Sequence, residues 1–136
     1  MKNNNGVVHF EMPAEDRKRM ADFYADAFGW KTELLGEDMG NYTLVTTTEI
    51  DEKGMIKNPG AINGGFYPKN DVPKEQQHPS VVIGVEDINE TINKIRNAGG
   101  QVLGEPVEIP GHGMYVAFND TEGNRSGVMQ PFETVE

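Results

Sequence analysis

The chain of 136 residues contains no cysteine. This absence excludes a disulfide framework, a thiolate nucleophile and thiolate metal sites. The sequence also lacks an apolar run of membrane-spanning length, and its first five residues do not form the apolar part of a signal peptide. We therefore expect a cytoplasmic protein that has no membrane partner.

Basic residues are scarce, with 12 Lys and Arg against 22 Asp and Glu, and the net charge is −10. A nucleic-acid interface needs clustered basic side chains to replace condensed counterions, so we expect no nucleic-acid partner. An acidic surface repels phosphates and attracts cationic small molecules. With 36% apolar and 25% charged residues, the composition is that of one ordinary soluble globular domain.

One segment pattern occurs twice, at a distance of about 71 residues. An apolar strand pattern at 7–12 is followed by a helical pattern that ends at Gly29. A second strand pattern at 81–85 is followed by a helical pattern that ends at Gly99 and Gly100. Such a repeat defines the architecture of a short chain. It predicts two βαβββ modules, about 6–67 and 79–132, joined by a linker at 68–78 within one domain, 1–136. Since neither module can bury both of its faces alone, the predicted α+β fold pairs them.

The helix of the first copy gives the clearest local signal. We expect Pro13 to end the opening strand and Glu15 and Asp16 to lie in the first helical turn, where negative charge suits the helix dipole. Gly29 is the expected left-handed cap. The apolar residues of the predicted helix follow a helical stripe at i, i+3, i+4, i+7 and i+8: Met20, Phe23, Tyr24, Ala27 and Phe28.

The opening strand carries two ionisable residues, His9 and Glu11, that alternation places on one face. The other face carries Phe10 and Met12 and is expected to meet the helices. A carboxylate beside an imidazole can form an acid/base pair that works near neutral pH. His9 and Glu11 are therefore candidate catalytic residues and candidate ligand contacts. The structural alternative is a packed His9 and a hydrogen-bonded Glu11 without chemistry.

This layout resembles the vicinal oxygen chelate superfamily, which includes glyoxalase I, bleomycin-resistance proteins and extradiol dioxygenases. The resemblance covers nearly the whole chain. It is carried by the strand around His9, the Phe23–Tyr24 pair, Phe28–Gly29–Trp30, the turn 120–124 and the ending 127–131. Together with Gly64–Gly65, that ending resembles the glyoxalase-related branch. The resemblance implies that the two modules close a U-shaped cavity.

In metal-using members of this superfamily, each module supplies ligands from its first and fourth strands. The resemblance places these positions at His9, near Gly65, at Ser80 and near Gly127. Neither 61–67 nor 125–132 contains Asp, Glu or His. A divalent metal site needs three or four such ligands, so we predict no metal and no other cofactor. The alternative is a divalent metal bound weakly at His9.

Aromatic residues and a methionine are further candidates for ligand contacts, because cavities in this architecture are apolar with few polar groups. The structural alternative for each of them is ordinary core packing. His78 and His112 are weaker candidates, more simply a linker and a turn residue. The predicted ligand-binding set, besides His9 and Glu11, is Tyr42, Tyr67, Tyr115 and Met129.

The preferred hypothesis is a glyoxalase/bleomycin-resistance-like protein that binds a small molecule in the inter-module cavity without metal. The alternative is a lyase, isomerase or dioxygenase-type enzyme on a carbonyl or aromatic metabolite, using His9 and Glu11 or an atypical metal site. A third hypothesis is a regulatory or assembly module with a vestigial cavity. We expect negligible lactoylglutathione lyase activity. Homodimers are common for this architecture, although no sequence feature demonstrates one here.

Overall fold

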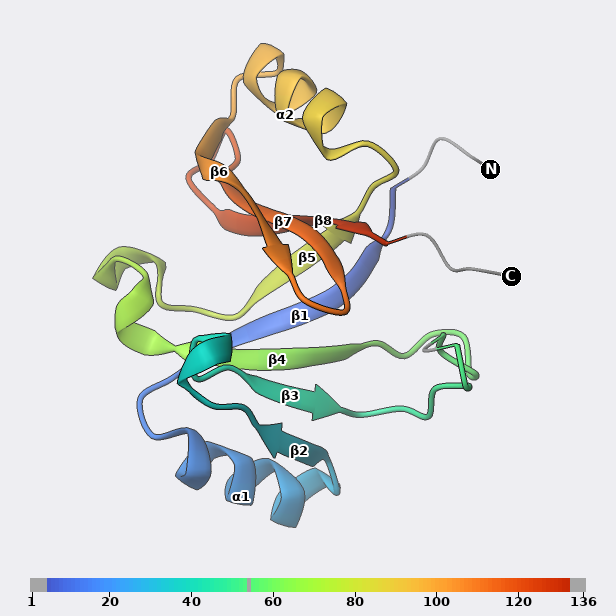
Figure 1. Cartoon of the computed structure of the whole chain (residues 1–136). Coiled ribbons are helices and arrows are strands. Elements are labelled where there is room, and N and C mark those ends of the chain that lie inside the picture. The colour runs from blue at the N-terminus through green and yellow to red at the C-terminus, as the bar shows by residue number, and fades with distance from the viewer. Residues whose placement is uncertain (1–4, 54, 133–136) are drawn as a thin grey trace. The chain divides into compact units, whose positions relative to one another are not determined.

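The computed structural model describes residues 5–53 and 55–132, which form eight strands and two α-helices (Figure 1). The predicted α+β class is confirmed. The chain divides into two compact units, here called the N-unit (His9–Pro79) and the C-unit (Ser80 onward, with the residues up to Val8). No helix within the described ranges is long and apolar enough to cross a membrane.

The N-unit contains four strands, one α-helix and three 3₁₀ turns. Its sheet has the order β2-β3-β4-β1, with β1 parallel to β4 and the other pairs antiparallel. Figure 1 shows β4, β3 and β2 side by side, with α1 next to β2. The elements are β1 (Val7–Ala14), α1 (Arg17–Phe28), β2 (Lys31–Leu34), η1 (Glu37–Met39), β3 (Thr43–Thr46), β4 (Asn63–Pro68), η2 (Lys69–Asp71) and η3 (Lys74–Gln76).

The start of α1 differs from the prediction, while its end agrees with it. Pro13 does not end β1 but pairs with Tyr67 in β4. Asp16 is the N-cap, whose side chain accepts a hydrogen bond from the Arg19 amide at 3.0 Å, and the first turn contains no acidic residue. Gly29 has the predicted left-handed conformation, with φ 76°. Pro13 fits a strand because its fixed φ is compatible with extended backbone, so a proline marks a strand end only approximately.

The apolar stripe predicted for α1 is only partly buried. Met20 and Tyr24 of the stripe pack against the core of Ala14, Val45 and Phe66, whereas Ala27 is exposed and the buried residue of the helix is Ala21, which lies outside the predicted stripe. Phe23 and Phe28, in contrast, are 57% and 65% exposed. Their rings contact Tyr24, which stacks on Trp30, so they extend an aromatic cluster along the helix and do not reach the sheet.

The C-unit repeats the same element order with an aliphatic core. Its sheet has the order β5-β8-β7-β6, with β5 parallel to β8. The register of β6 shifts between Leu103 and Val107, a stretch that contains Pro106, which has no backbone amide hydrogen to donate to the ladder. The buried core is Val85, Ile88, Ile92, Val116 and Val128. The elements are β5 (Ser80–Gly84), α2 (Ile88–Asn97), β6 (Gln101–Ile109), β7 (Gly113–Asn119) and β8 (Arg125–Pro131).

Strand pairing aligns the two units residue by residue. Asp16 and Asp87 cap the two helices in the same way, each accepting a hydrogen bond from a first-turn amide. Glu11 pairs with Gly65 in the N-unit, and Val82 pairs with Gly127 in the C-unit. The alignment therefore equates the following residues of the N-unit and C-unit: His9 with Ser80, Glu11 with Val82, Arg17 with Ile88, Tyr42 with Tyr115, Thr43 with Val116, Gly65 with Gly127, Phe66 with Val128 and Tyr67 with Met129.

Candidate functional site

His9 and Glu11 lie on the face of β1 that faces away from α1. Phe10 and Met12, which alternate with them, pack into the core together with the helix residue Met20. The side chains of His9 and Glu11 are half-buried. In β4, Asn63 pairs with His9 and Gly65 pairs with Glu11, so the same face continues onto the neighbouring strand.

Tyr42 joins the two ionisable residues. Its hydroxyl donates a hydrogen bond to Oε2 of Glu11 at 3.1 Å, and Nε2 of His9 lies 3.2 Å from the same hydroxyl oxygen. A phenol has one hydrogen to donate, and that hydrogen is directed at Glu11. When the phenol donates to Glu11 in this way, Nε2 of His9 is the donor of the second bond. We call this half-buried set of His9, Tyr42 and Glu11 the Tyr42 bridge.

Gly65 makes the Tyr42 bridge sterically feasible. Tyr42 directly precedes β3, and β4 lies between β3 and β1, so the ring must cross β4 to reach Glu11. It crosses at Gly65, where an added Cβ would overlap the ring and hydroxyl of Tyr42. On the opposite face the neighbouring Gly64 makes room for the ring of Phe10, whose nearest atom lies 2.5 Å from the place of a Cβ. The two adjacent glycines thus serve opposite faces of one strand.

The C-unit repeats the crossing tyrosine, and it has Ser80 and Val82 at the positions that His9 and Glu11 occupy in the N-unit. A Cβ on Gly127 would lie 2.6 Å from Cε1 and 2.7 Å from the hydroxyl oxygen of Tyr115. Tyr115 pairs with Met129 in the sheet. The remaining predicted site residue, Tyr67, pairs with Pro13 in the N-unit. The aromatic candidates Tyr42 and Tyr115 therefore occupy equivalent positions, as do Tyr67 and Met129.

The residues at the four expected metal positions do not fit the ligand set that the resemblance implies. At Gly65 the space of a ligating side chain is filled by the ring of Tyr42, and at Gly127 it is filled by the ring of Tyr115. Ser80 offers a hydroxyl where the N-unit has the imidazole of His9. Within residues 5–53 and 55–132, no group of three or more His, Cys, Asp and Glu side chains could hold a metal ion.

Each unit has a surface hollow, but neither hollow is lined by a predicted site residue. One of about 480 Å³ lies against α2 in the C-unit and is lined mainly by aliphatic residues and Phe118. The other, of about 380 Å³, lies at the start of α1 and includes Arg19 and Lys69. The predicted ligand-contact residues therefore lie at the Tyr42 bridge and Tyr67 in the N-unit and at Tyr115 and Met129 in the C-unit, outside the lining of these hollows.

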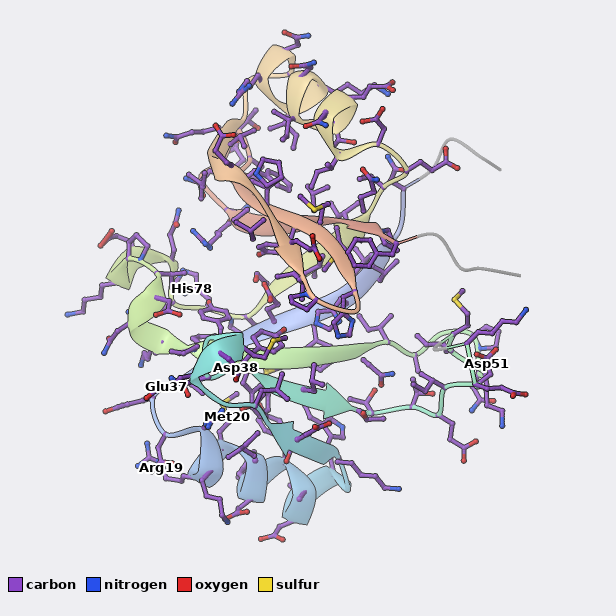
Figure 2. The ribbon with its side chains drawn as sticks, in the orientation of Figure 1. Arg19, Met20, Glu37, Asp38, Asp51 and His78 are labelled. Carbon is purple, nitrogen blue, oxygen red and sulfur yellow. The ribbon has the colours of Figure 1, made fainter. Side chains whose placement is uncertain are left out.

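The other two histidines have local roles. His78, labelled in Figure 2, is exposed, and its Nε2 lies 2.8 Å from the carbonyl oxygen of Glu75. The backbone amide of His112 donates to the carbonyl of Ile109 at 2.9 Å in the turn before β7. Both placements agree with the simpler interpretation of these residues as linker and turn positions.

Two modules of the order βαβββ, with opening and fourth strands parallel, define a glyoxalase-like protein. The family model "Glyoxalase/Bleomycin resistance protein/Dioxygenase superfamily" matches residues 6–127, and the chain belongs to this superfamily. The predicted family membership is thus confirmed.

Individual relatives resemble the chain at moderate identity. A "Glyoxylase-like domain-containing protein" of Didymella fabae is 29% identical over 127 residues, which covers 90% of this chain and 91% of the relative. The anthracycline biosynthesis protein DnrV of Streptomyces peucetius is 25% identical over 91% of this chain, which spans only 48% of that relative. A solved structure of methylmalonyl-CoA epimerase in complex with methylmalonyl-CoA and NH4+ has a TM-score of 0.69 at 16% identity and covers 96% of both chains. This last likeness supports the fold alone.

Proposed function

We propose that this protein binds a small amphipathic, cationic molecule without a metal ion, and that the Tyr42 bridge provides its polar contacts. The observation that carries this proposal is the crossing of Tyr42 over Gly65 to Glu11 and His9. A phenol fills the space that a metal ligand would need, and a carboxylate remains on the same face.

The charge of the site and of the chain supports a cationic ligand. Glu11 is a half-buried carboxylate that already accepts a hydrogen bond from Tyr42. A charge-assisted hydrogen bond from an ammonium group to such a carboxylate is stronger than a neutral one. The net charge of −10 adds a long-range attraction for cations.

The binding proposal is tested with matched pairs of small molecules. Protein treated with EDTA is titrated calorimetrically with 2-phenylethylamine and longer aryl-alkylamines, each against the alcohol of the same skeleton. We expect the amine to bind at least about tenfold more tightly than the alcohol, which corresponds to about 1.4 kcal/mol. Glu11→Gln should abolish this preference. Equal affinity for amine and alcohol, or binding only after addition of a divalent metal, would contradict the proposal.

A second candidate function is proton transfer at a carbon next to a carbonyl group. It is favoured by the hydrogen-bonded order His9, Tyr42, Glu11, in which an acid and a base are joined through a phenol. One of the two ionisable residues, His9 or Glu11, would act as the base and take a proton from the carbon. The carbonyl oxygen would gain the resulting negative charge as an enolate. A proton would then return to the same carbon. Deuterium incorporation into 2-oxo acids or acyl thioesters in D₂O, followed by proton NMR, tests this. Incorporation no faster than in buffer would contradict it.

A further inference from the structure

One guanidinium nitrogen of Arg17 binds three backbone carbonyl groups at once. Nη1 donates to the carbonyl oxygens of Leu35 at 2.6 Å, Asn41 at 3.0 Å and Tyr42 at 3.3 Å. Arg17 is the first residue of α1, where the positive end of the helix dipole disfavours a cation. The three carbonyl groups offset this penalty, since each directs a partial negative charge at the guanidinium group.

These three carbonyl groups belong to the loop that presents Tyr42. The loop 35–42 is closed by a hydrogen bond from the Leu35 amide to the Tyr42 carbonyl at 2.9 Å. It contains Asn41 with φ 55°, a left-handed conformation that is uncommon for residues other than glycine. Tyr42 precedes Thr43, the first residue of β3, and so it lies where the loop enters the strand. Its backbone position depends on how this loop is held.

In the C-unit, the helix position equivalent to Arg17 is occupied by an apolar residue. The equivalent of Arg17 is Ile88, which is 3% exposed and belongs to the aliphatic core. The equivalent of Tyr42 is Tyr115, which lies inside β7 and pairs with Val107 on one side and Met129 on the other. Pairing on both sides fixes Tyr115 without help from the helix. The helix residue is charged only in the unit whose tyrosine lies outside the strand.

We propose that Arg17 is a positioning residue for the Tyr42 phenol: it fixes the loop 35–42 and thereby holds the Tyr42 hydroxyl between His9 and Glu11. This inference rests on the proposed function of the Tyr42 bridge, which it extends by one residue that binds the backbone of the loop carrying Tyr42. Arg17 acts on the site through the backbone of Tyr42.

The test uses the ligand-free protein with ¹³C at the phenolic carbon of tyrosine, so that its four tyrosines give four NMR signals. Tyr42→Phe assigns the signal of Tyr42. Arg17→Met should move this signal toward its position in the unfolded chain and leave the other three in place. Arg17→Lys, which retains a cation with three donors, should give an intermediate shift. In the amine titrations, Arg17→Met should weaken binding of 2-phenylethylamine severalfold, and this effect should vanish in the Tyr42→Phe background.

Arg19→Met is the matched control, because it removes the same charge from the same helix. Arg19 is exposed near the start of α1, where Figure 2 labels it. The substitution Arg19→Met should leave all four tyrosine signals unchanged. If Arg17→Met and Arg17→Lys lower the melting temperature but leave the Tyr42 signal in place, Arg17 only stabilises the fold and the proposal is overturned. Failure to bind any amine would overturn the proposed function instead, because the NMR result requires no ligand. If Arg17→Met does not fold, Arg17→Lys alone decides the question.

Discussion

The N-unit and the C-unit share a backbone framework and differ in the side chains that carry chemistry. Both cap their helix with aspartate, pair the opening strand with the fourth strand, and lay a tyrosine over a glycine of that strand. The N-unit has an imidazole, His9, and a carboxylate, Glu11, at the two positions where the C-unit has Ser80 and Val82. Val82 is buried. The framework therefore requires the glycine and tolerates either a polar or an apolar residue opposite it.

The largest difference that we expect between the units concerns their cores. Phe66 and its equivalent Val128 are each 1% exposed, but Phe66 belongs to an aromatic core. Phe66→Ala should lower the free energy of unfolding by about 3–5 kcal/mol, and Val128→Ala by roughly 1.5–3 kcal/mol, because less apolar volume is removed. Urea unfolding measures both. A Val128→Ala loss as large as that of Phe66→Ala would show that the aromatic core carries no extra stability.

The two crossing glycines give the next largest effect. Gly65→Ala places a methyl group against the ring of Tyr42, and Gly127→Ala places one against Tyr115. Each should destabilise the protein by about 1–3 kcal/mol through overpacking. Gly65→Ala should also remove the preference for amines over alcohols, because it displaces the Tyr42 hydroxyl that donates to Glu11, whereas Gly127→Ala should leave this preference in place. Loss of that preference in Gly127→Ala as well would break the distinction between the units.

A buried hydroxyl distinguishes a further pair of equivalent residues. Thr43 is 0% exposed, and its hydroxyl oxygen has no hydrogen-bond partner, whereas its equivalent in the C-unit is Val116. Thr43→Val should therefore raise the free energy of unfolding by about 1 kcal/mol, since it replaces an unsatisfied hydroxyl with a methyl group of similar volume. The reverse change, Val116→Thr, should cost about 1–3 kcal/mol. Destabilisation by Thr43→Val would argue against this account.

The smallest expected effect concerns the connection between the last two strands of each unit. In the C-unit, β7 and β8 are joined by the short turn 120–124, whereas in the N-unit β3 and β4 are joined by the longer segment 47–62. The backbone amide of Asn124, then its side chain, then the Glu122 amide hold the pKa of the Asp120 carboxyl below its ordinary value of 3.8. The folded pKa is thus lower than the unfolded one, so this contribution to stability is present above pH 3.8 and is lost as the pH falls through the folded pKa.

Asp120→Ala should accordingly lower the melting temperature slightly at pH 7, with a difference from the unmodified protein that shrinks in acid below the ordinary pKa. Thermal unfolding followed by circular dichroism across this pH range measures it. A difference that grows as the pH falls would contradict the assignment. The Tyr42 signal should stay in place, because the turn belongs to the other unit.

Much of the framework could be predicted from sequence because it depends on local patterns. Alternation places His9 and Glu11 together, and Gly29 and Asp87 mark helix ends through local backbone geometry. The loss of expected metal ligands also follows from residue types, since glycine has no side chain. The exposure of Phe28 could not be predicted, because its helical spacing does not show that its ring stacks on neighbouring aromatics instead of the sheet.

The Tyr42 bridge could be predicted only in part. The sequence predicts an apolar ligand contact for Tyr42, whereas its polar role depends on strand order, which puts Gly65 between Tyr42 and Glu11. The sequence alone does not predict the role that we propose for Arg17. One signal was available: a cation in the first turn of a helix, at the position where the second copy has Ile88.

The most direct test of the account measures the affinity of EDTA-treated protein for 2-phenylethylamine before and after Tyr42→Phe. Tyr24→Phe is the matched control, because it removes a hydroxyl from the aromatic cluster of the same unit and keeps the ring. We predict that Tyr42→Phe weakens binding by about tenfold, the loss expected for one hydrogen bond at a charged site, and that Tyr24→Phe has no effect. Unchanged affinity in Tyr42→Phe, or affinity that appears only with a divalent metal, would contradict the central claim.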